Sequence, residues 1–377
     1  MFVSAGEVSG DHYIASVAKR LRDRGYDGRV CGLCGAEARS VGVEGLWNAE
    51  RLQLMGVSEV LGSIRDILSL KRQMQRAIVR QNPAALVLAD SPDFHLPLMR
   101  ALRRAGYAGK IFYISPPSVW AWRSYRVRDL KRCVDENLPL FKFEHDYLVR
   151  AGCFSYWVGH PLVEEFESFR PDRARIVSQI HGVSHDGRIV ALLPGSRRSE
   201  VEMLYPVLSG LYASLEEAGF TPVFSVAPGL SESAAMFLGS RLEAAGERRY
   251  DGPGRDLMAV SETVVGSSGT ATAQALLLRR YMVVLYKLRP LSAFIGKILL
   301  RHLFFAVPNL LAGEMFYPEL LQENATSEKA FDAAMKWLRG SSEDRACALS
   351  KMEGLAALMG RAGVCDFWAD RILAAVN

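Results

Sequence analysis

The chain has 377 residues, of which 49% are hydrophobic and 23% charged, and a formal net charge of +5. This length allows two domains with full hydrophobic cores, and the composition excludes a disordered or fibrous protein. No segment has the pattern of a signal peptide, and the longest apolar candidate, 285–311, carries four basic residues and a histidine, so we expect a cytoplasmic protein without a membrane span.

Short apolar strand-like segments alternate with amphipathic helical segments along the chain. In the first half, we predict strands at 2–5, 29–31, 85–89, 110–115, 138–141 and 156–159. In the second half, we predict strands at 188–193, 221–227, 263–266 and 281–286. Apolar residues recur at helical spacing at 12–24, 96–105, 201–218, 233–245, 270–278 and 328–338. This alternation is typical of parallel sheets covered by helices.

A polar segment at 164–187 separates the two halves. The pattern predicts an α/β protein with two doubly wound, Rossmann-like domains, at 1–165 and 186–345, which face each other across a cleft. The segment 346–377 has apolar residues at helical spacing and could pack back on the first domain, although periodicity alone does not say where.

Carboxylates follow two of the predicted strands in the first half. Asp90 and Asp93 come directly after the strand at 85–89, and Glu7 follows the strand at 2–5. Because ligands of open α/β sheets bind outside the carboxyl ends of the strands, Asp90 or Asp93 could act as a general base. The alternative is structural: either carboxylate could cap the next helix or order the turn at Pro92.

Basic and aromatic residues are concentrated between Arg100 and Arg132, where nine Lys or Arg accompany one acidic residue, Asp129. This mixture fits nucleic acid, an anionic membrane surface or a phosphorylated substrate, and the charge alone does not choose between them. Further along, His160 follows the strand at 156–159, where a hydrogen-bonded structural histidine is commoner than a catalytic one.

The second half contains a strand–turn–helix junction at 189–202. An apolar strand ends at Pro194-Gly195, and Ser199 and Glu202 have the spacing of a capping box. Free backbone N–H groups, with Arg197 or Arg198, would there face an anion such as a diphosphate. The alternative is an ordinary capped turn.

A second junction of this kind runs from 263 to 274. Its small residues allow a ligand close to the backbone, and the hydroxyls of Ser268, Thr270 and Thr272 could bind oxygen-rich groups. Two such helix ends could hold a nucleotide diphosphate from two sides, or could simply be two capped helices.

No metal or redox site is expected. The spacing of Asp90 and Asp93 is not that of a DxD metal motif, and no second cysteine pair or histidine cluster completes a zinc site with Cys31 and Cys34. The six cysteines are expected to be buried, reduced thiols, and a thioredoxin-like redox role for Cys31 and Cys34 is the alternative.

Nine segments, in this order and spacing, resemble those of the lipid-A-disaccharide synthase family. They are AGEVSGD (5–11), LMGVSEVL (54–61), DSPDF (90–94), SVWAWR (118–123), LPLFKFE (138–144), VGHPL (158–162), LPGSR (193–197), SGTAT (268–272) and PNLLAG (308–313). The resemblance covers nearly the whole chain.

The resemblance implies a GT-B glycosyltransferase of lipid A (lipopolysaccharide) biosynthesis that needs no metal or other cofactor. Members join UDP-2,3-diacylglucosamine to 2,3-diacylglucosamine 1-phosphate (lipid X), with inversion, and release a β-1,6-linked disaccharide 1-phosphate and UDP. The first domain would then bind the acceptor and the second the donor.

The resemblance also suggests site residues. Asp93 would be the catalytic base, with Glu7 and Asp90 as reserve or orienting carboxylates. The expected substrate-binding residues are Ser9, Asp11, Trp122, Arg123, His160, Ser196, Arg197, Ser268, Gly269, Thr270, Ala271, Gln274, Asn309 and Gly313.

The chain departs from the family pattern at a few positions. It reads Gly-Leu-Cys-Gly at 32–35, and it has His95 and Arg198 where Asn and Gly are usual. Gln274 stands where Glu is usual, which removes a charge from a position suited to ribose hydroxyls. Two other functions therefore stay open: a UDP-sugar epimerase of the same architecture, and a catalytically silent nucleotide-sugar or lipid-binding protein.

Acylated substrates imply peripheral contact with the cytoplasmic face of the inner membrane. The basic, partly apolar segments 57–78 and 291–305 are the candidates for that contact, although such helices often pack on their own domain. We expect no nucleic acid partner, and a homodimer is possible.

Overall fold

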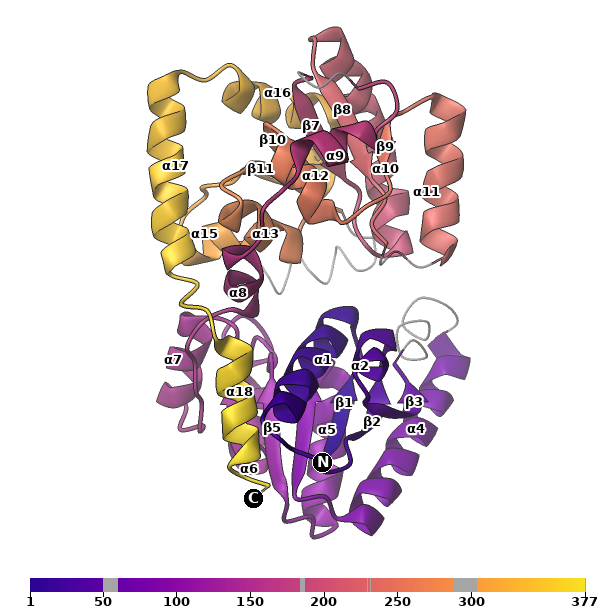
Figure 1. Ribbon diagram of the computed structural model, residues 1–377, viewed down its shortest axis with the longest axis vertical. Coiled ribbons are helices and arrows are strands. Elements are labelled where there is room, and N and C mark those ends of the chain that lie inside the picture. Colours follow the sequence, from indigo (N-terminus) through magenta and orange to yellow (C-terminus); the bar gives the residue numbers. More distant parts are fainter. Residues whose placement is uncertain (50–59, 184–186, 229, 231, 288–303, 377) are drawn as a thin grey trace. The chain divides into compact units, whose positions relative to one another are not determined.

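The computed structural model describes residues 1–49, 60–183, 187–228, 230, 232–287 and 304–376. It divides the chain into two compact units. Unit 1 comprises Met1–Glu164 and Met359–Asn377, and unit 2 comprises Glu165–Leu358. Each unit is a parallel sheet with helices on both faces (Figure 1).

The sheet of unit 1 has six parallel strands in the order β3-β2-β1-β4-β5-β6. The strands are β1 (Phe2–Ala5), β2 (Cys31–Cys34), β3 (Glu44–Asn48), β4 (Ala85–Ala89), β5 (Lys110–Ile114) and β6 (Glu136–Leu138). The chain order reverses between β1 and β4, which pair with Phe2 beside Leu86 and Ala5 beside Ala89. All residues of both strands are buried, because helices cover both faces of the sheet.

Helices complete two apolar cores in unit 1, one on each face of the sheet. They are α1 (Val8–Asp23), α2 (Ala36–Ser40), α4 (Val60–Gln81), α5 (Pro92–Arg104), α6 (Val127–Cys133), α7 (Lys142–Arg150) and α18 (Val364–Leu373), with α8 (Pro161–Glu167) at the boundary of the units and the 3₁₀ turn η1 (Ser124–Arg126) before α6.

Unit 2 repeats this topology, in the order β12-β11-β10-β7-β8-β9. Its strands are β7 (Ile189–Leu193), β8 (Thr221–Ser225), β9 (Arg249–Tyr250), β10 (Thr263–Ser267), β11 (Tyr281–Tyr286) and β12 (Glu319–Leu321). Its helices are α9 (Arg173–Ser178), α10 (Arg198–Glu217), α11 (Glu232–Ala245), α12 (Gly254–Val260), α13 (Thr270–Leu277), α15 (Val307–Ala312), α16 (Ser327–Leu338) and α17 (Ser342–Ala357), with the 3₁₀ turn η2 (Gln322–Asn324). The chain order reverses between β7 and β10.

The predicted α/β class with two Rossmann-like units is confirmed, but some elements differ. The short strands β3, β6, β9 and β12 lie outside or only partly inside the predicted ranges. The strand predicted at 156–159 is absent, and isolated bridges pair Ser155 with Asn137 and Gly159 with Gly360.

The segment 346–377 divides between the two units. Helix α17 contacts α13 and α15 of unit 2, whereas α18 packs on α1 of unit 1. Trp368 of α18 is 1% exposed and meets Tyr13 of α1 edge-on, with ring centroids 5.8 Å apart. Packing on the first domain therefore holds only for the last part of the segment.

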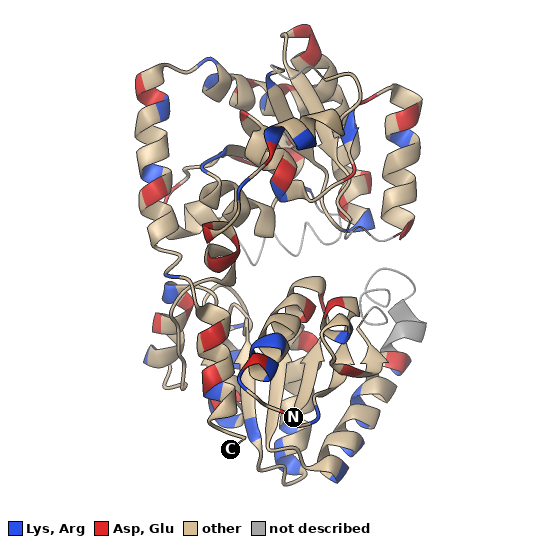
Figure 2. Ribbon diagram, viewed as in Figure 1, with Lys and Arg blue, Asp and Glu red and all other residues tan. Residues whose placement is uncertain are grey.

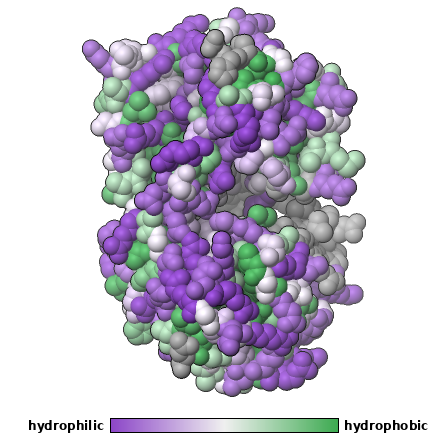
Figure 3. All heavy atoms as spheres, in the orientation of Figure 1, coloured by the Kyte–Doolittle hydropathy of each residue, from purple (hydrophilic) through white to green (hydrophobic). Residues whose placement is uncertain are grey.

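The described residues contain no helix with the length and apolarity needed to cross a membrane. On the face drawn in Figure 3, hydrophobic residues lie in small groups among hydrophilic ones.

Candidate functional site

Asp90 lies at the point where the strand order of unit 1 reverses. Its Oδ1 accepts hydrogen bonds from the Gly6 amide at 3.2 Å and from the Ser91 hydroxyl at 2.6 Å. Its Oδ2 is buried without a hydrogen-bond partner and points at Gly10, where any side chain would collide with it. Burial, and secondarily the charge of Glu7, raises the pKa of Asp90 to about 7. Asp90 therefore links the β1–α1 and β4–α5 turns from a site closed to solvent.

Three side chains hold the backbone around Asp90. The Asp90 carbonyl accepts hydrogen bonds from His95 Nδ1 and from the Tyr113 hydroxyl, both at 2.7 Å. A carbonyl can only accept, so His95 carries its proton on Nδ1, and Nε2 accepts from the Ser4 hydroxyl at 2.7 Å. Burial lowers the pKa of His95 to about 4, so the ring is neutral at physiological pH. His95 thus orders the turn.

Asp93 is the accessible aspartate of this turn. Its side chain is 74% exposed, and its Oδ1 accepts hydrogen bonds from Arg123 at 2.9 Å and from Arg126. Arg126 is itself buried, and the Arg123 guanidinium lies 4.0 Å from the centre of the Trp122 ring. Trp122, Arg123 and Asp93 therefore lie together, as the sequence predicts, and Arg126 is a further member that the predicted set lacks.

Other residues of the predicted set in unit 1 separate into exposed and structural ones. Glu7 and Ser9 are exposed at the start of α1. Asp11 is buried and accepts hydrogen bonds from three amides at the start of α2, those of Gly35, Glu37 and Ala38. Asp11 therefore holds α2 in place.

His160 is buried as well, at 3% exposure. Its Nδ1 accepts a hydrogen bond from the Leu162 amide at 3.1 Å, and its ring packs on Phe141. It therefore orders the start of α8 from the interior of unit 1, which is the structural alternative for this histidine.

In unit 2, the first junction has a different cap from the predicted one. Helix α10 begins at Arg198, and the Glu200 carboxylate accepts hydrogen bonds from the Ser196 and Arg197 amides at 3.0 and 3.3 Å. Glu202 instead pairs with Arg198 at 2.7 Å. The predicted Ser199–Glu202 capping box is therefore wrong, since the helix starts one residue before Ser199. Ser196 and Arg197 are exposed on this turn.

The second junction has an open helix start. Gly269 has a φ of 133° with no atom near the site of a Cβ, and Thr270 is exposed at the beginning of α13. The first amides of a helix have no acceptor within it, so those of Thr270 and Ala271 are placed to meet an anion. Gln274 follows one turn later, half-buried.

Two of the three hydroxyls predicted to bind a ligand have backbone partners. Ser268 donates to the Phe305 carbonyl at 2.8 Å. Thr272 is buried, donates to the Gly269 carbonyl at 2.9 Å and accepts from the Val307 amide at 3.1 Å. Of the three hydroxyl residues, Thr270 is the exposed one.

Asn309 is a structural residue rather than part of a pocket wall. Its amide group donates to the Tyr317 carbonyl and the Glu319 carboxylate, both at 2.8 Å, and its oxygen accepts from the Phe316 and Tyr317 amides. These four hydrogen bonds use both N–H donors and both oxygen lone pairs of the side-chain amide. Gly313 ends α15 with a φ of 69°, a conformation that favours glycine.

The described residues contain no group of three or more His, Cys, Asp or Glu side chains placed to hold a metal ion. Five of the cysteines are buried free thiols and Cys347 is exposed.

Two Rossmann-like units in one chain, each with helix starts at the reversal of its strand order, define the GT-B fold class. A UDP-GlcNAc 2-epimerase from Neisseria meningitidis, solved with bound UDP-GlcNAc, is similar to this chain with a TM-score of 0.64 over 99% of this chain and 98% of that chain. The two sequences are only 10% identical, so the likeness concerns the fold alone.

Sequence comparison identifies the family. Residues 1–359 match the sequence model of the lipid-A-disaccharide synthetase family. Lipid-A-disaccharide synthase from Myxococcus xanthus is 34% identical over 96% of this chain and 93% of its own length. The enzyme of this name from Azotobacter vinelandii is 36% identical over 91% of this chain and 90% of its own length. The chain belongs to the lipid-A-disaccharide synthase family of glycosyltransferases.

The buried Asp90 makes the stability of the protein depend on pH. Its carboxyl ionises at pH 3.8 in ordinary surroundings but near pH 7 in the fold. Protonated Asp90 therefore makes its full contribution to the free energy of unfolding below pH 3.8, and this contribution is lost as the pH rises towards 7. We expect Asp90→Asn, which cannot ionise, to gain up to about 4 kcal/mol relative to the parent between about pH 4 and about pH 8.

Urea unfolding of both proteins across this pH range measures the difference. Asp146→Asn is the control for replacing a carboxylate by an amide elsewhere in unit 1, at a partly exposed side chain that pairs with Lys142. An Asp90→Asn effect that is the same at both ends of the range would contradict the buried, protonated carboxyl.

Proposed function

We propose that the chain transfers the sugar of UDP-2,3-diacylglucosamine to the 6-hydroxyl of 2,3-diacylglucosamine 1-phosphate. The products are a β-1,6-linked disaccharide 1-phosphate and UDP, and the anomeric carbon is inverted. Family membership over residues 1–359 is the observation that carries this proposal. The reaction is a single displacement: the acceptor oxygen bonds to the anomeric carbon as the bond to the diphosphate breaks.

Unit 1 binds the acceptor in this proposal, and unit 2 binds the donor. Unit 1 has accessible carboxylates at its strand reversal, Asp93 and Glu7, which suit a substrate hydroxyl. Unit 2 has at its strand reversal the starts of α10 and α13, which suit a diphosphate.

Asp93 is the proposed general base. Both arginines bind its Oδ1, which leaves Oδ2 to accept the proton of the acceptor hydroxyl. These two charge-assisted hydrogen bonds fix the orientation of the Asp93 carboxylate. Burial raises the pKa of Asp90, but its Oδ2 is closed to solvent, so its part is to position the turn that carries Asp93.

The departing diphosphate needs positive charge. The Thr270 and Ala271 amides, beside Gly269, supply partial charge at the start of α13, and Arg197, beside Ser196, supplies a full one. Because Glu200 already binds two amides of the α10 turn, α13 offers the more open helix start. Gln274 is placed to hydrogen-bond the nucleotide ribose without adding a negative charge.

Release of UDP separates this proposal from its alternatives. We expect purified protein to release UDP from UDP-2,3-diacylglucosamine only when 2,3-diacylglucosamine 1-phosphate is present. An epimerase would convert the UDP-sugar without any acceptor, and a silent binding protein would bind UDP without turnover. Either result would overturn the proposed reaction.

We expect Asp93→Asn to lower turnover by about two decades or more, because Asn keeps the shape of the side chain but cannot take the proton. UDP binding, measured by calorimetry, should stay close to that of the parent. Asp146→Asn removes an exposed carboxylate of unit 1 that pairs with Lys142, and it should leave turnover unchanged. Turnover of Asp93→Asn within a few-fold of the parent would remove Asp93 from the mechanism.

We expect Arg197→Ala to lower kcat/KM for the donor by about 10- to 100-fold, the effect of losing one charge-assisted hydrogen bond to the diphosphate. Arg198→Ala is the matched control. It removes the neighbouring guanidinium, which pairs with Glu202, and should change donor use only slightly. Equal effects of the two substitutions would indicate general surface charge rather than a diphosphate contact.

Acylated substrates also imply contact with an anionic membrane surface, and helix α4 carries the proposed contact. Met74 and Ile78 of the candidate segment 57–78 are fully buried, and Ile67 packs against the core. The opposite face exposes Arg65, Leu68, Arg72, Arg76, Val79 and Arg80. Figure 2 shows basic residues, in blue, at several places along this helix. The other candidate, 291–305, lies almost wholly outside the described residues.

Replacing Arg72 and Arg76 with Glu should weaken binding to anionic liposomes, because each basic residue near such a surface contributes about 1 kcal/mol. The loss should be about tenfold or more in a flotation assay, while UDP binding stays the same. Substituting two exposed basic residues of unit 2, Arg249 and Arg339, with Glu provides the control. Parental liposome binding by the α4 variant would show that the membrane contact lies elsewhere.

A further inference from the structure

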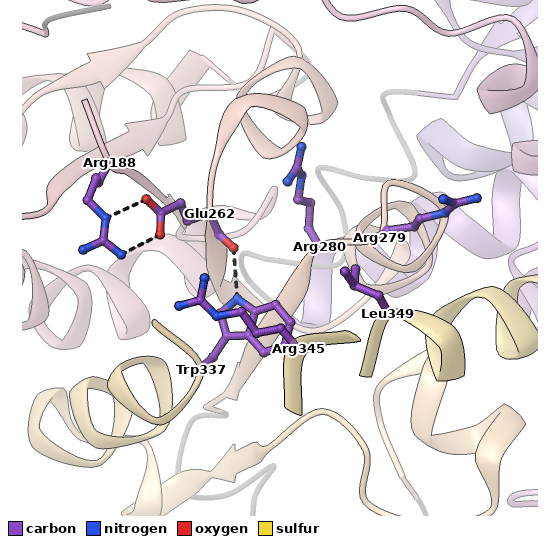
Figure 4. A pocket seen from close by; sticks show the side chains of 7 residues that line it. All are labelled: Arg188, Glu262, Arg279, Arg280, Trp337, Arg345 and Leu349. Atoms are coloured by element: carbon purple, nitrogen blue, oxygen red, sulfur yellow. Dashed lines mark hydrogen bonds and ion pairs between the residues drawn. The ribbon is translucent and has the colours of Figure 1, made fainter. Parts of the chain in front are cut away.

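A cavity of about 390 Å³ lies at the amino-terminal edge of the unit 2 sheet, opposite the strand ends proposed for the donor (Figure 4). Arg188, Glu262 and Arg280 directly precede β7, β10 and β11, and they form one side of the cavity. Trp337 of α16 and Arg345 of α17 form the other side. Arg279 and Leu349 complete the lining.

The lining has more positive than negative charge. Arg188 and Glu262 neutralise each other through two hydrogen bonds of 2.8 and 2.9 Å. Arg279 pairs with Glu353 at 2.9 Å. Within the part of the chain that the structure describes, Arg280 and Arg345 form no ion pair with a carboxylate. Two guanidinium charges of the lining are therefore not balanced by an acid.

These two guanidinium groups are also incompletely hydrogen-bonded. Arg280 donates from Nη2 to the Ala259 carbonyl and Arg345 from Nη2 to the Leu338 carbonyl, each at 2.6 Å. The Nε atom of each is buried without an acceptor. Burial, and then the nearby charge of Arg173, lowers the pKa of Arg280. A guanidinium has five N–H donors, so both arginines have capacity for an anion that also has charge to balance.

The wall behind them is fixed. Trp337 Nε1 donates to the Glu262 carbonyl at 3.1 Å, and its ring stacks on Tyr281 at 4.6 Å between centroids. The Arg345 guanidinium lies 5.8 Å from the centre of the same ring, and Figure 4 shows these two side chains next to each other. Stacking already occupies the Tyr281 side of the ring, so recognition of a ligand would come from the arginines rather than from stacking on a base.

We propose that this cavity is a second anion site, which binds a phosphate group through Arg280 and Arg345. The phosphate could be free or part of a lipid headgroup, since guanidinium groups recognise the same oxygens in either. The site does not depend on the proposed reaction. Helix α13 connects it to the proposed donor site. The helix begins at Thr270, in the proposed diphosphate site, and ends at Leu277, three residues before Arg280.

The test measures phosphate binding to the full chain. Inorganic phosphate is titrated calorimetrically in the presence of saturating UDP, and neutral vesicles with and without phosphatidic acid are used in a flotation assay. We expect saturable binding in at least one arm, weakened about tenfold or more by Arg345→Gln and by Arg280→Gln. Binding of inorganic phosphate identifies a soluble ligand, and binding only to phosphatidic acid vesicles identifies a lipid headgroup.

The matched control is Arg339→Gln, which removes an exposed charge at the end of α16 outside the cavity lining and should bind like the parent. Replacing Arg345 should disturb the fold less than replacing Arg280, because α17 lies at the surface whereas Arg280 binds the carbonyl of the buried Ala259 in α12. Thermal unfolding checks that both variants fold. No binding in either arm, or binding that Arg345→Gln leaves unchanged, would show that these arginines only cap the carboxyl ends of α12 and α16.

Discussion

The pairing of two fully buried parallel strands at each reversal of strand order is the constraint on which the rest of the structure depends. β1 pairs with β4 in unit 1, and β7 pairs with β10 in unit 2. The helices that follow two such strands leave on opposite faces of the sheet, so their connecting turns diverge and leave a place between them for a ligand. Most of the proposed site residues therefore lie in four short turns, although they come from positions far apart in the sequence.

In unit 1, buried polar groups, and not apolar packing alone, fix the two turns at the strand reversal. Asp90 and Ser91 both have left-handed backbone conformations, with φ of 51° and 45°. Such conformations are costly for residues other than glycine, and hydrogen bonds from Gly6, His95 and Tyr113 compensate for that cost. The turn presents Asp93 outward as a consequence. His95 fulfils this task as a neutral donor.

The sequence predicts well the ends of the strands that pair at the two reversals, β1, β4, β7 and β10, because short apolar runs followed by Gly, Ser or Asp are local signals. It predicts less well what each polar side chain at those ends does. Thr272 and Ser268 bind backbone groups at 305–307, and Asn309 binds groups at 316–319, partners that no local pattern reveals. The distinction between the buried carboxyl of Asp90 and the exposed Asp93 depends on Gly10, which lies eighty residues before Asp90 in the chain.

The cap of α10 shows the same limit at shorter range. Ser199 and Glu202 have the spacing of a capping box, but the helix is capped two residues earlier, with Arg197 at the N-cap and Glu200 at N3. Glu200 reaches two amides at once, and Gly195 leaves space for its side chain with a φ of 109°. Which of the two overlapping residue pairs caps the helix thus depends on the backbone conformation of the turn, which the residue types allow but do not determine.

The return of the chain to unit 1 has a consequence for biosynthesis. Helix α18 follows all of unit 2 in the sequence, yet Trp368, Val364 and Ile372 belong to the core of unit 1. During translation the ribosome completes unit 2 before it supplies this last piece. Domains generally fold as they emerge, the amino-terminal one first. Here the first domain to emerge would be the last to close, with the surface around Tyr13 open to chaperones until α18 has been synthesised.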